Sequence, residues 1–166
     1  MAAFISLPIF AILVMLQSVL VSRVPLLFGT ADVVMLTITA WALHDRVTTA
    51  WFWALVGGLM VSLVSGVPGF IPLVGYLILT GIARFLRKSI WQTPILTMLL
   101  ASFLGTLVTH GLTVAALQFE GIGMPLQTVI NQVTLPSALL NLLLALPVYA
   151  LVNDLANSLY PSEIDV

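Results

Sequence analysis

The stretch QTPILTMLLASFLGTLVTHGLTVAALQ, residues 92–118, contains no lysine, arginine, aspartate or glutamate. A helix that crosses the hydrocarbon core of a bilayer needs roughly 20 apolar residues, and this stretch is longer than that. The whole 166-residue chain has the same character, because 61% of its residues are hydrophobic and 7% are charged. A soluble domain carries about a quarter charged residues. We therefore expect an all-α polytopic membrane protein.

Breaks in apolarity divide the chain into six predicted spans, at about 4–22, 27–43, 48–65, 68–86, 92–118 and 127–152. The connecting loops are short, so we expect a single integral membrane domain, residues 1–166, folded as a compact bundle of six transmembrane helices. The first apolar segment is longer than the roughly 7 to 15 residues of a signal peptide's apolar region and has no basic stretch before it. It is predicted to be a retained helix.

The distribution of basic residues predicts the orientation of these spans. If the six spans alternate in direction, one side of the membrane has four of the five basic residues, Arg46, Arg84, Arg87 and Lys88, and the other side has only Arg23. Cytoplasmic loops carry an excess of lysine and arginine, so both termini are expected in the cytoplasm. The tryptophans, at positions 41, 51, 53 and 91, fall near the same span ends, where indoles favour the headgroup region.

Two predicted spans carry small residues at every fourth position. The third span has Ala54, Gly58, Ser62 and Gly66, and the fifth has Thr97, Ala101, Gly105, Thr109 and Thr113. In lipid, such seams let helix backbones approach closely. They are expected to pack inside the bundle, against each other or other helices. The alternative is that one seam faces lipid in the free protein and receives a partner's helix.

The sixth span contains Pro136 and Pro147. A proline inside a helix leaves one carbonyl without its donor, and in lipid a neighbouring group must satisfy that carbonyl. Ser137 and Asn141 are the local polar candidates. This span is expected to be kinked, either for structural reasons or because it lines a ligand cavity.

Two ionisable residues fall within predicted spans. Asp32 opens the second span and is expected to cap its helix or to contact a substrate, and His110 in the fifth span is expected to be a packing residue or a ligand. The chain has no cysteine, no H-E-x-x-H or G-x-S-x-G motif and no phosphate-binding loop. The scattered basic residues do not predict nucleic-acid binding. We therefore expect a binding or scaffold protein without catalytic residues, metal or cofactor.

Several motifs resemble, in order, those of the rod shape-determining protein MreD family. They are GTADVV (29–34), GGLMVSLVSG (57–66), GF (69–70), GY (75–76), PSALLN (136–141) and ALPVY (145–149). The resemblance covers nearly the whole chain, and the matching positions are Asp32, Gly58, Gly66, Pro136, Asn141, Pro147 and Tyr149. The chain departs from the family at Ala31, where a proline is common, and at Ser62, where an aspartate is common.

The resemblance implies a non-enzymatic scaffold of the bacterial cell-elongation machinery in the cytoplasmic membrane. Its implied partner is an MreC-like bitopic protein and, through it, the penicillin-binding transpeptidase, RodA and MreB. MreD-like proteins are also similar in architecture to the substrate-binding subunits of energy-coupling-factor transporters, which supplies an alternative function. Those subunits commonly carry Ala-x-x-x-Ala on the first helix, and this chain's early alanines, at 2, 3 and 11, lack that spacing. Under the alternative, Asp32, His110 and Asn141 are the substrate-site candidates.

Overall fold

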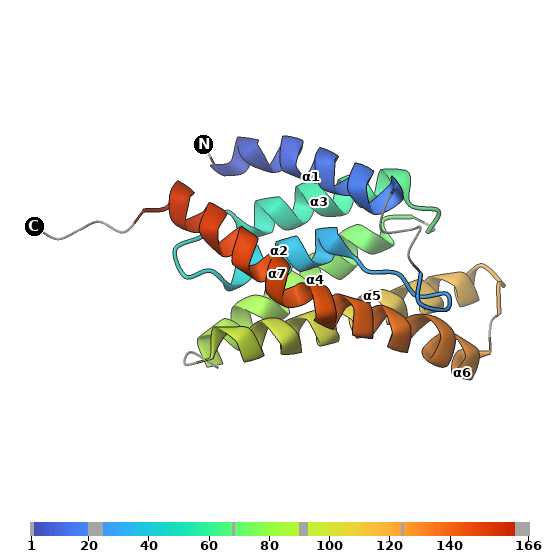
Figure 1. Cartoon of the computed structure of the whole chain (residues 1–166). Helices are drawn as coiled ribbons and strands as arrows, with labels where there is room; N and C mark the ends of the chain where they lie inside the picture. The colour runs from blue at the N-terminus through green and yellow to red at the C-terminus, as the bar shows by residue number, and fades with distance from the viewer. Residues whose placement is uncertain (1, 20–24, 68, 90–92, 124, 162–166) are drawn as a thin grey trace, which may run out of the picture.

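The computed structural model describes residues 2–19, 25–67, 69–89, 93–123 and 125–161. All regular elements in these ranges are helical: α1 (Ala2–Val19), α2 (Val33–Leu43), α3 (Ala50–Val64), α4 (Ile71–Ser89), α5 (Pro94–Phe119), α6 (Leu126–Val129), the π-helix η2 (Ile130–Thr134) and α7 (Leu135–Leu159). The long helices lie side by side, and α1 begins at the same end of the bundle at which α7 ends (Figure 1).

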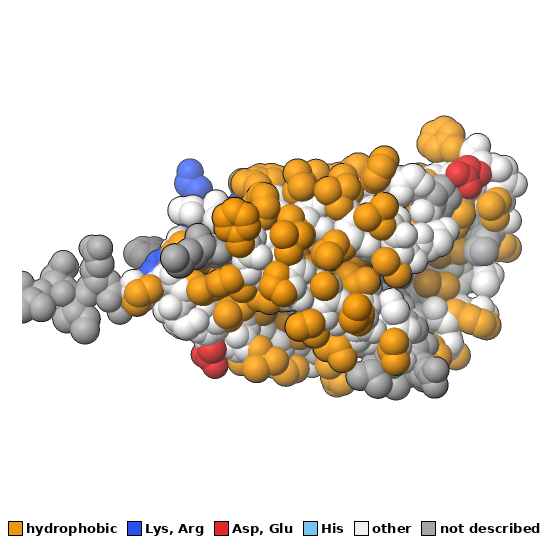
Figure 2. Space-filling view, turned by 90° about the horizontal axis from the view of Figure 1, so that it is seen from above, with side chains coloured by type: hydrophobic (Ala, Val, Ile, Leu, Met, Phe, Trp, Pro, Cys, Tyr) orange, Lys and Arg blue, Asp and Glu red, His pale blue; other side chains and the backbone are white. Residues whose placement is uncertain are grey.

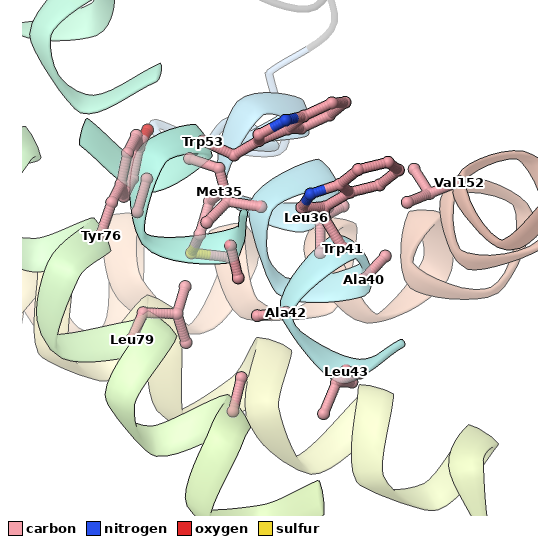
Figure 3. Close-up of a cluster of buried hydrophobic side chains, with 14 of the residues drawn as sticks. Met35, Leu36, Ala40, Trp41, Ala42, Leu43, Trp53, Tyr76, Leu79 and Val152 are labelled. Carbon is pink, nitrogen blue, oxygen red and sulfur yellow. The ribbon is translucent and has the colours of Figure 1, made fainter. Parts of the chain in front are cut away.

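Helix α2 forms the centre of the bundle. Every residue from Val34 to Leu43 is buried, and α2 packs against α1, α3, α4, α5 and α7. A helix that is apolar on all sides is expected in such a position. The Trp41 indole of α2 stacks on the Trp53 indole of α3, with ring centroids 3.8 Å apart (Figure 3).

The interfacial position expected for the tryptophans is therefore wrong for two of them. Trp41 and Trp53 are fully buried, because packing of α3 on α2 encloses their large apolar rings. Trp51 is half exposed, at 51%. Trp91 lies outside the described residues.

Two helix boundaries differ most from the predicted spans. The second span was expected from residue 27, but α2 begins at Val33, because the Asp32 side chain caps it by accepting a hydrogen bond from the Met35 N–H at 2.9 Å. The last span was expected to end at 152, but α7 continues to Leu159. The next residue, Tyr160, places its hydroxyl 3.3 Å from the Thr49 hydroxyl in the α2–α3 connection.

Two helical runs are long and apolar enough to cross a membrane. They are Pro94–Phe119 and the continuous run Leu126–Leu159, with mean hydropathies of 1.7 and 2.0. Helices α1, α2 and α3 are apolar but shorter. Hydrophobic side chains cover the face that carries α1, and the charged side chains visible there lie toward the two ends (Figure 2).

Candidate functional site

The non-helical segment 28–32, which leads into α2, lies against the beginning of α7. One hydrogen bond joins the segment to η2, from the Phe28 N–H to the Gln132 carbonyl at 3.1 Å. Two join it to α7, from the Thr30 N–H to Ser137 Oγ at 3.1 Å and from the Asp32 N–H to Asn141 Oδ1 at 2.7 Å. Residues 26–29 form a tight turn closed by reciprocal backbone hydrogen bonds between Leu26 and Gly29, and the chain continues from it without helix to Asp32. The three partners, from Gln132 to Asn141, span more than two turns of the helical run at about 3.6 residues per turn.

Pro136 explains the first of these bonds. Its ring removes the N–H that would otherwise reach the Gln132 carbonyl one turn earlier, and the Phe28 N–H occupies that carbonyl instead. The sequence predicted a compensating donor but pointed to Ser137 and Asn141, whose oxygens are acceptors in this contact. Both prolines lie within the continuous helical run Leu126–Leu159, Pro136 just after the π-helix and Pro147 inside α7.

Gly29 allows this close contact. A Cβ built on Gly29 would lie 2.5 Å from the backbone nitrogen of Ser137 and 2.8 Å from the Val133 carbonyl oxygen. Both atoms belong to helix backbone, which cannot move aside as a flexible side chain can. Gly29 was not among the predicted site residues, although it opens the GTADVV motif. That motif was the only signal that pointed to it.

The Asp32 carboxylate links α2 to α4. Besides capping α2 through Met35, it accepts a hydrogen bond from the Tyr76 hydroxyl at 2.6 Å. Its backbone partner Asn141 in turn donates from Nδ2 to Thr106 Oγ1 on α5, at 2.9 Å.

We call the set Asp32, Tyr76, Thr106, Ser137 and Asn141 the polar junction. It connects helices α2, α4, α5 and α7, and all its members except Asp32 are buried. Among the described residues, every buried side-chain nitrogen or oxygen has a hydrogen-bond partner. Tyr76 and Thr106 were not among the predicted site residues, and Ser137 was predicted only as a local polar group beside Pro136. The GY and PSALLN motifs contained two of them, and nothing in the sequence marked Thr106.

A pocket of about 280 Å³ lies beside the polar junction. Asp32, His110 and Asn141 all line it, together with Gln17 and Tyr76. The His110 ring is held by Thr134 of the π-helix, with Nδ1 and Oγ1 3.2 Å apart. The structure therefore brings together the three residues that the sequence named as candidates for a substrate site.

The small-residue seam of α3 packs against α4. A Cβ on Gly58 would lie 2.7 Å from the Cα of Leu73, and the Ser62 hydroxyl accepts a hydrogen bond from the Leu73 N–H at 3.3 Å. Ala54 is fully buried in the same seam. The expected fourth member, Gly66, lies beyond the end of α3, is exposed and has no atom within 4 Å of its Cβ position.

The seam of α5 packs against the other side of α4. A Cβ on Gly105 would lie 2.8 Å from a terminal carbon of Leu79, and the Thr109 methyl lies 2.9 Å from the Cβ position of Gly75. Ala101 is fully buried. Both seams are thus occupied within the chain, with α4 between them. The alternative that one of them faces lipid and receives a partner's helix is wrong.

Tyr149 lies toward the opposite end of the bundle, where it lines a different pocket. Within the described ranges, no group of three or more histidine, cysteine, aspartate or glutamate side chains gathers, so no set of metal ligands can be named there. The polar junction can fix helices to one another, and the pocket beside it can accept a small polar molecule. No family model, curated protein or solved structure matches the chain.

Proposed function

We propose that the chain is a multi-pass protein of the bacterial cytoplasmic membrane and a non-enzymatic scaffold of the cell-elongation machinery. In this role it binds an MreC-like bitopic protein and so supports peptidoglycan synthesis and rod shape. One observation carries the proposal: three motifs that resemble MreD, at 29–34, 75–76 and 136–141, meet in the polar junction. Motifs that hold helices together are what a scaffold without catalytic chemistry needs.

The proposal includes six membrane crossings, as in the substrate-binding subunits of energy-coupling-factor transporters, with both termini in the cytoplasm. Among the proposed crossings α2 is the shortest and spans only about 16 Å, whereas the hydrocarbon core is about 30 Å thick. The non-helical segment 28–32 belongs to the same crossing in this proposal. Non-helical backbone is tolerated at membrane depth where protein satisfies its polar groups, and η2 and α7 do so here.

The buried seams restrict where a partner can bind. Because α4 fills the small-residue seams of α3 and α5, contacts with a bitopic partner fall on the outer helix faces. Helix α1 lies at the edge of the bundle, contacts mainly α3 and α2, and exposes apolar side chains such as Phe4 and Met15. Such faces suit association within the bilayer, where close packing drives helix contact.

Affinity purification of the tagged chain from its native membrane in mild detergent, followed by mass spectrometry, tests this proposal. We expect an MreC-like bitopic protein, with or without the penicillin-binding transpeptidase and RodA. The matched control is the same chain with Gly29→Val, which disrupts the polar junction and should lose the partner together with the fold. Recovery of paired ATPases with a larger membrane subunit would contradict the scaffold role.

The pocket of about 280 Å³ favours a second candidate, a substrate-binding subunit of an energy-coupling-factor vitamin transporter. Asp32, His110 and Asn141 would then contact the vitamin. A thermal-shift screen against vitamins tests it, since a ligand at 100 times its dissociation constant stabilises the folded state by about 2.7 kcal/mol. A true pocket ligand should lose this effect in His110→Phe and keep it in His44→Phe, because His44 lies at the other end of the bundle. A screen in which no vitamin stabilises the chain would contradict this candidate.

A further inference from the structure

A second polar pocket, of about 270 Å³, lies at the end of the bundle opposite the polar junction. It is enclosed by the α2–α3 connection, the end of α4, the start of α5 and the last turns of α7. Seven of its lining side chains carry N–H or O–H donors: His44, Arg46, Arg87, Thr97, Tyr149, Asn153 and Asn157. Four of the five basic residues of the chain, Arg46, Arg84, Arg87 and Lys88, belong to this end.

The charge in this pocket is positive. Arg46 and Arg87 line it together with one carboxylate, Asp45, which pairs with Arg87 through Nε at 3.2 Å. This ion pair is exposed to solvent on the Asp45 side, at 73%, so its attraction is weakened. The pocket therefore retains one positive charge in excess, which favours an anion.

The arginines also have unused donors. Arg46 donates from Nη1 to the Tyr160 carbonyl at 3.3 Å, and Arg87 donates from Nη1 to the His44 carbonyl at 2.9 Å. A guanidinium has five N–H groups. Within the described part of the chain, each of these two side chains thus keeps N–H groups that no residue accepts from. Planar N–H pairs of this kind match the oxygens of a phosphate group.

We propose that this pocket binds the phosphate group of an anionic phospholipid headgroup. The inference rests on the proposed membrane location, which puts this end of the bundle at the level of the cytoplasmic headgroups. Basic pockets between membrane helices on that side are suited to anionic headgroups. The amides of Asn153 and Asn157 supply further donors, and Leu43 and Pro94 supply an apolar wall for the glycerol backbone.

Thermal unfolding of the purified full chain in detergent tests the site with three probes: short-chain phosphatidylglycerol, phosphatidylcholine of the same chain length and inorganic phosphate. We expect phosphatidylglycerol to raise the unfolding temperature more than either of the others. Arg46→Gln should weaken its apparent affinity by about tenfold. Lys88→Gln is the matched control, because it removes the same charge at the same end from an exposed residue that does not line the pocket.

If Arg46→Gln and Lys88→Gln weaken the affinity for phosphatidylglycerol equally, the proposal is overturned. The lipid would then bind by general charge attraction and not in the pocket. Equal stabilisation by phosphatidylcholine, or by inorganic phosphate at the same concentration, would overturn the lipid assignment. If Arg46→Gln fails to fold, Asn153→Ala replaces it, since Asn153 lines the pocket and is expected to weaken phosphatidylglycerol binding in the same direction.

The lipid assay contains no partner protein. Its result therefore remains valid even if no MreC-like protein is recovered in the purification. Membrane insertion is tested separately by washing vesicles that contain the chain with alkaline carbonate. Release of the chain by this wash would contradict the membrane location and, with it, the headgroup site. Retention of the chain together with a phosphatidylglycerol-specific shift supports both.

Discussion

The two ends of the bundle satisfy backbone polar groups in different ways. At the polar junction, short side chains and backbone N–H groups from several helices bond to one another in a buried network. At the opposite end, long arginine side chains reach back to loop carbonyls, as Arg84 does to Val47 at 2.7 Å and Arg87 to His44 at 2.9 Å. The first end therefore joins four helices through a buried network, whereas the second keeps arginine N–H groups that face a pocket.

Substituting Gly29 should cause the largest loss in the free energy of unfolding. In Gly29→Val the new side chain meets the backbone of η2 and α7, so the three bonds that segment 28–32 makes to these two helices are expected to break. We expect a loss of about 3 kcal/mol in the free energy of unfolding, measured by SDS titration in mixed micelles. Gly66→Val is the control, because its Cβ position has open space. If both variants lose the same free energy of unfolding, the close contact of Gly29 with the helix backbone is contradicted.

Removing the Asp32 carboxylate should lower the free energy of unfolding by less than Gly29→Val does. Asp32→Ala removes the cap of α2 and leaves the Tyr76 hydroxyl without its acceptor. The expected loss is about 2 kcal/mol, and Asp32→Asn, which keeps an acceptor oxygen, should lose less. Asp154→Ala on the exposed face of α7 serves as the control and should change the free energy of unfolding by less than about 0.5 kcal/mol. The interpretation fails if Asp154→Ala is as harmful as Asp32→Ala.

The two seams around α4 should respond unequally to the same change. Gly58→Ala meets the Cα of Leu73, whereas Gly105→Ala meets the mobile end of the Leu79 side chain. We expect a loss of about 1 to 2 kcal/mol for Gly58→Ala and less than about 1 kcal/mol for Gly105→Ala, again by SDS titration. The reverse order would show that α4 is seated differently between α3 and α5.

The smallest effect on stability is expected at the arginine end. Arg87→Gln breaks the exposed ion pair with Asp45, and such pairs contribute about 0 to 1 kcal/mol. The loss should shrink further at high salt, because ions screen exposed charges. A loss as large as that of Asp32→Ala would mean that this end fixes the fold as firmly as the polar junction does.

Apolar periodicity predicted the helices because each long helix is encoded by its own local sequence. Small residues at every fourth position correctly predicted close packing for Gly58 and Gly105, but spacing shows only which residues share a face and not which helix lies opposite. The polar junction could not be predicted either, because its members come from different helices. Asp32 and Asn141 are 109 residues apart in the chain, and nothing local pairs them.

Two further expectations from the sequence, for Trp41 and for the carbonyl freed by Pro136, were wrong. Trp41 stands near the end of a helix, where indoles often meet headgroups, yet α2 is enclosed on all sides and leaves no membrane-facing surface for this ring. The carbonyl freed by Pro136 was expected to need a local polar side chain, but the Phe28 N–H from the chain before α2 bonds to the Gln132 carbonyl instead. In both cases the surrounding tertiary structure decided the outcome.

The most direct test of the central claim, that the polar junction is a structural connection serving a scaffold, is the Tyr76→Phe variant. This change removes a single hydroxyl, the donor to the Asp32 carboxylate. We expect the free energy of unfolding to fall by about 1 kcal/mol while recovery of the bitopic partner stays at the wild-type level. Unchanged stability together with loss of the partner, or of a bound small molecule, would contradict it.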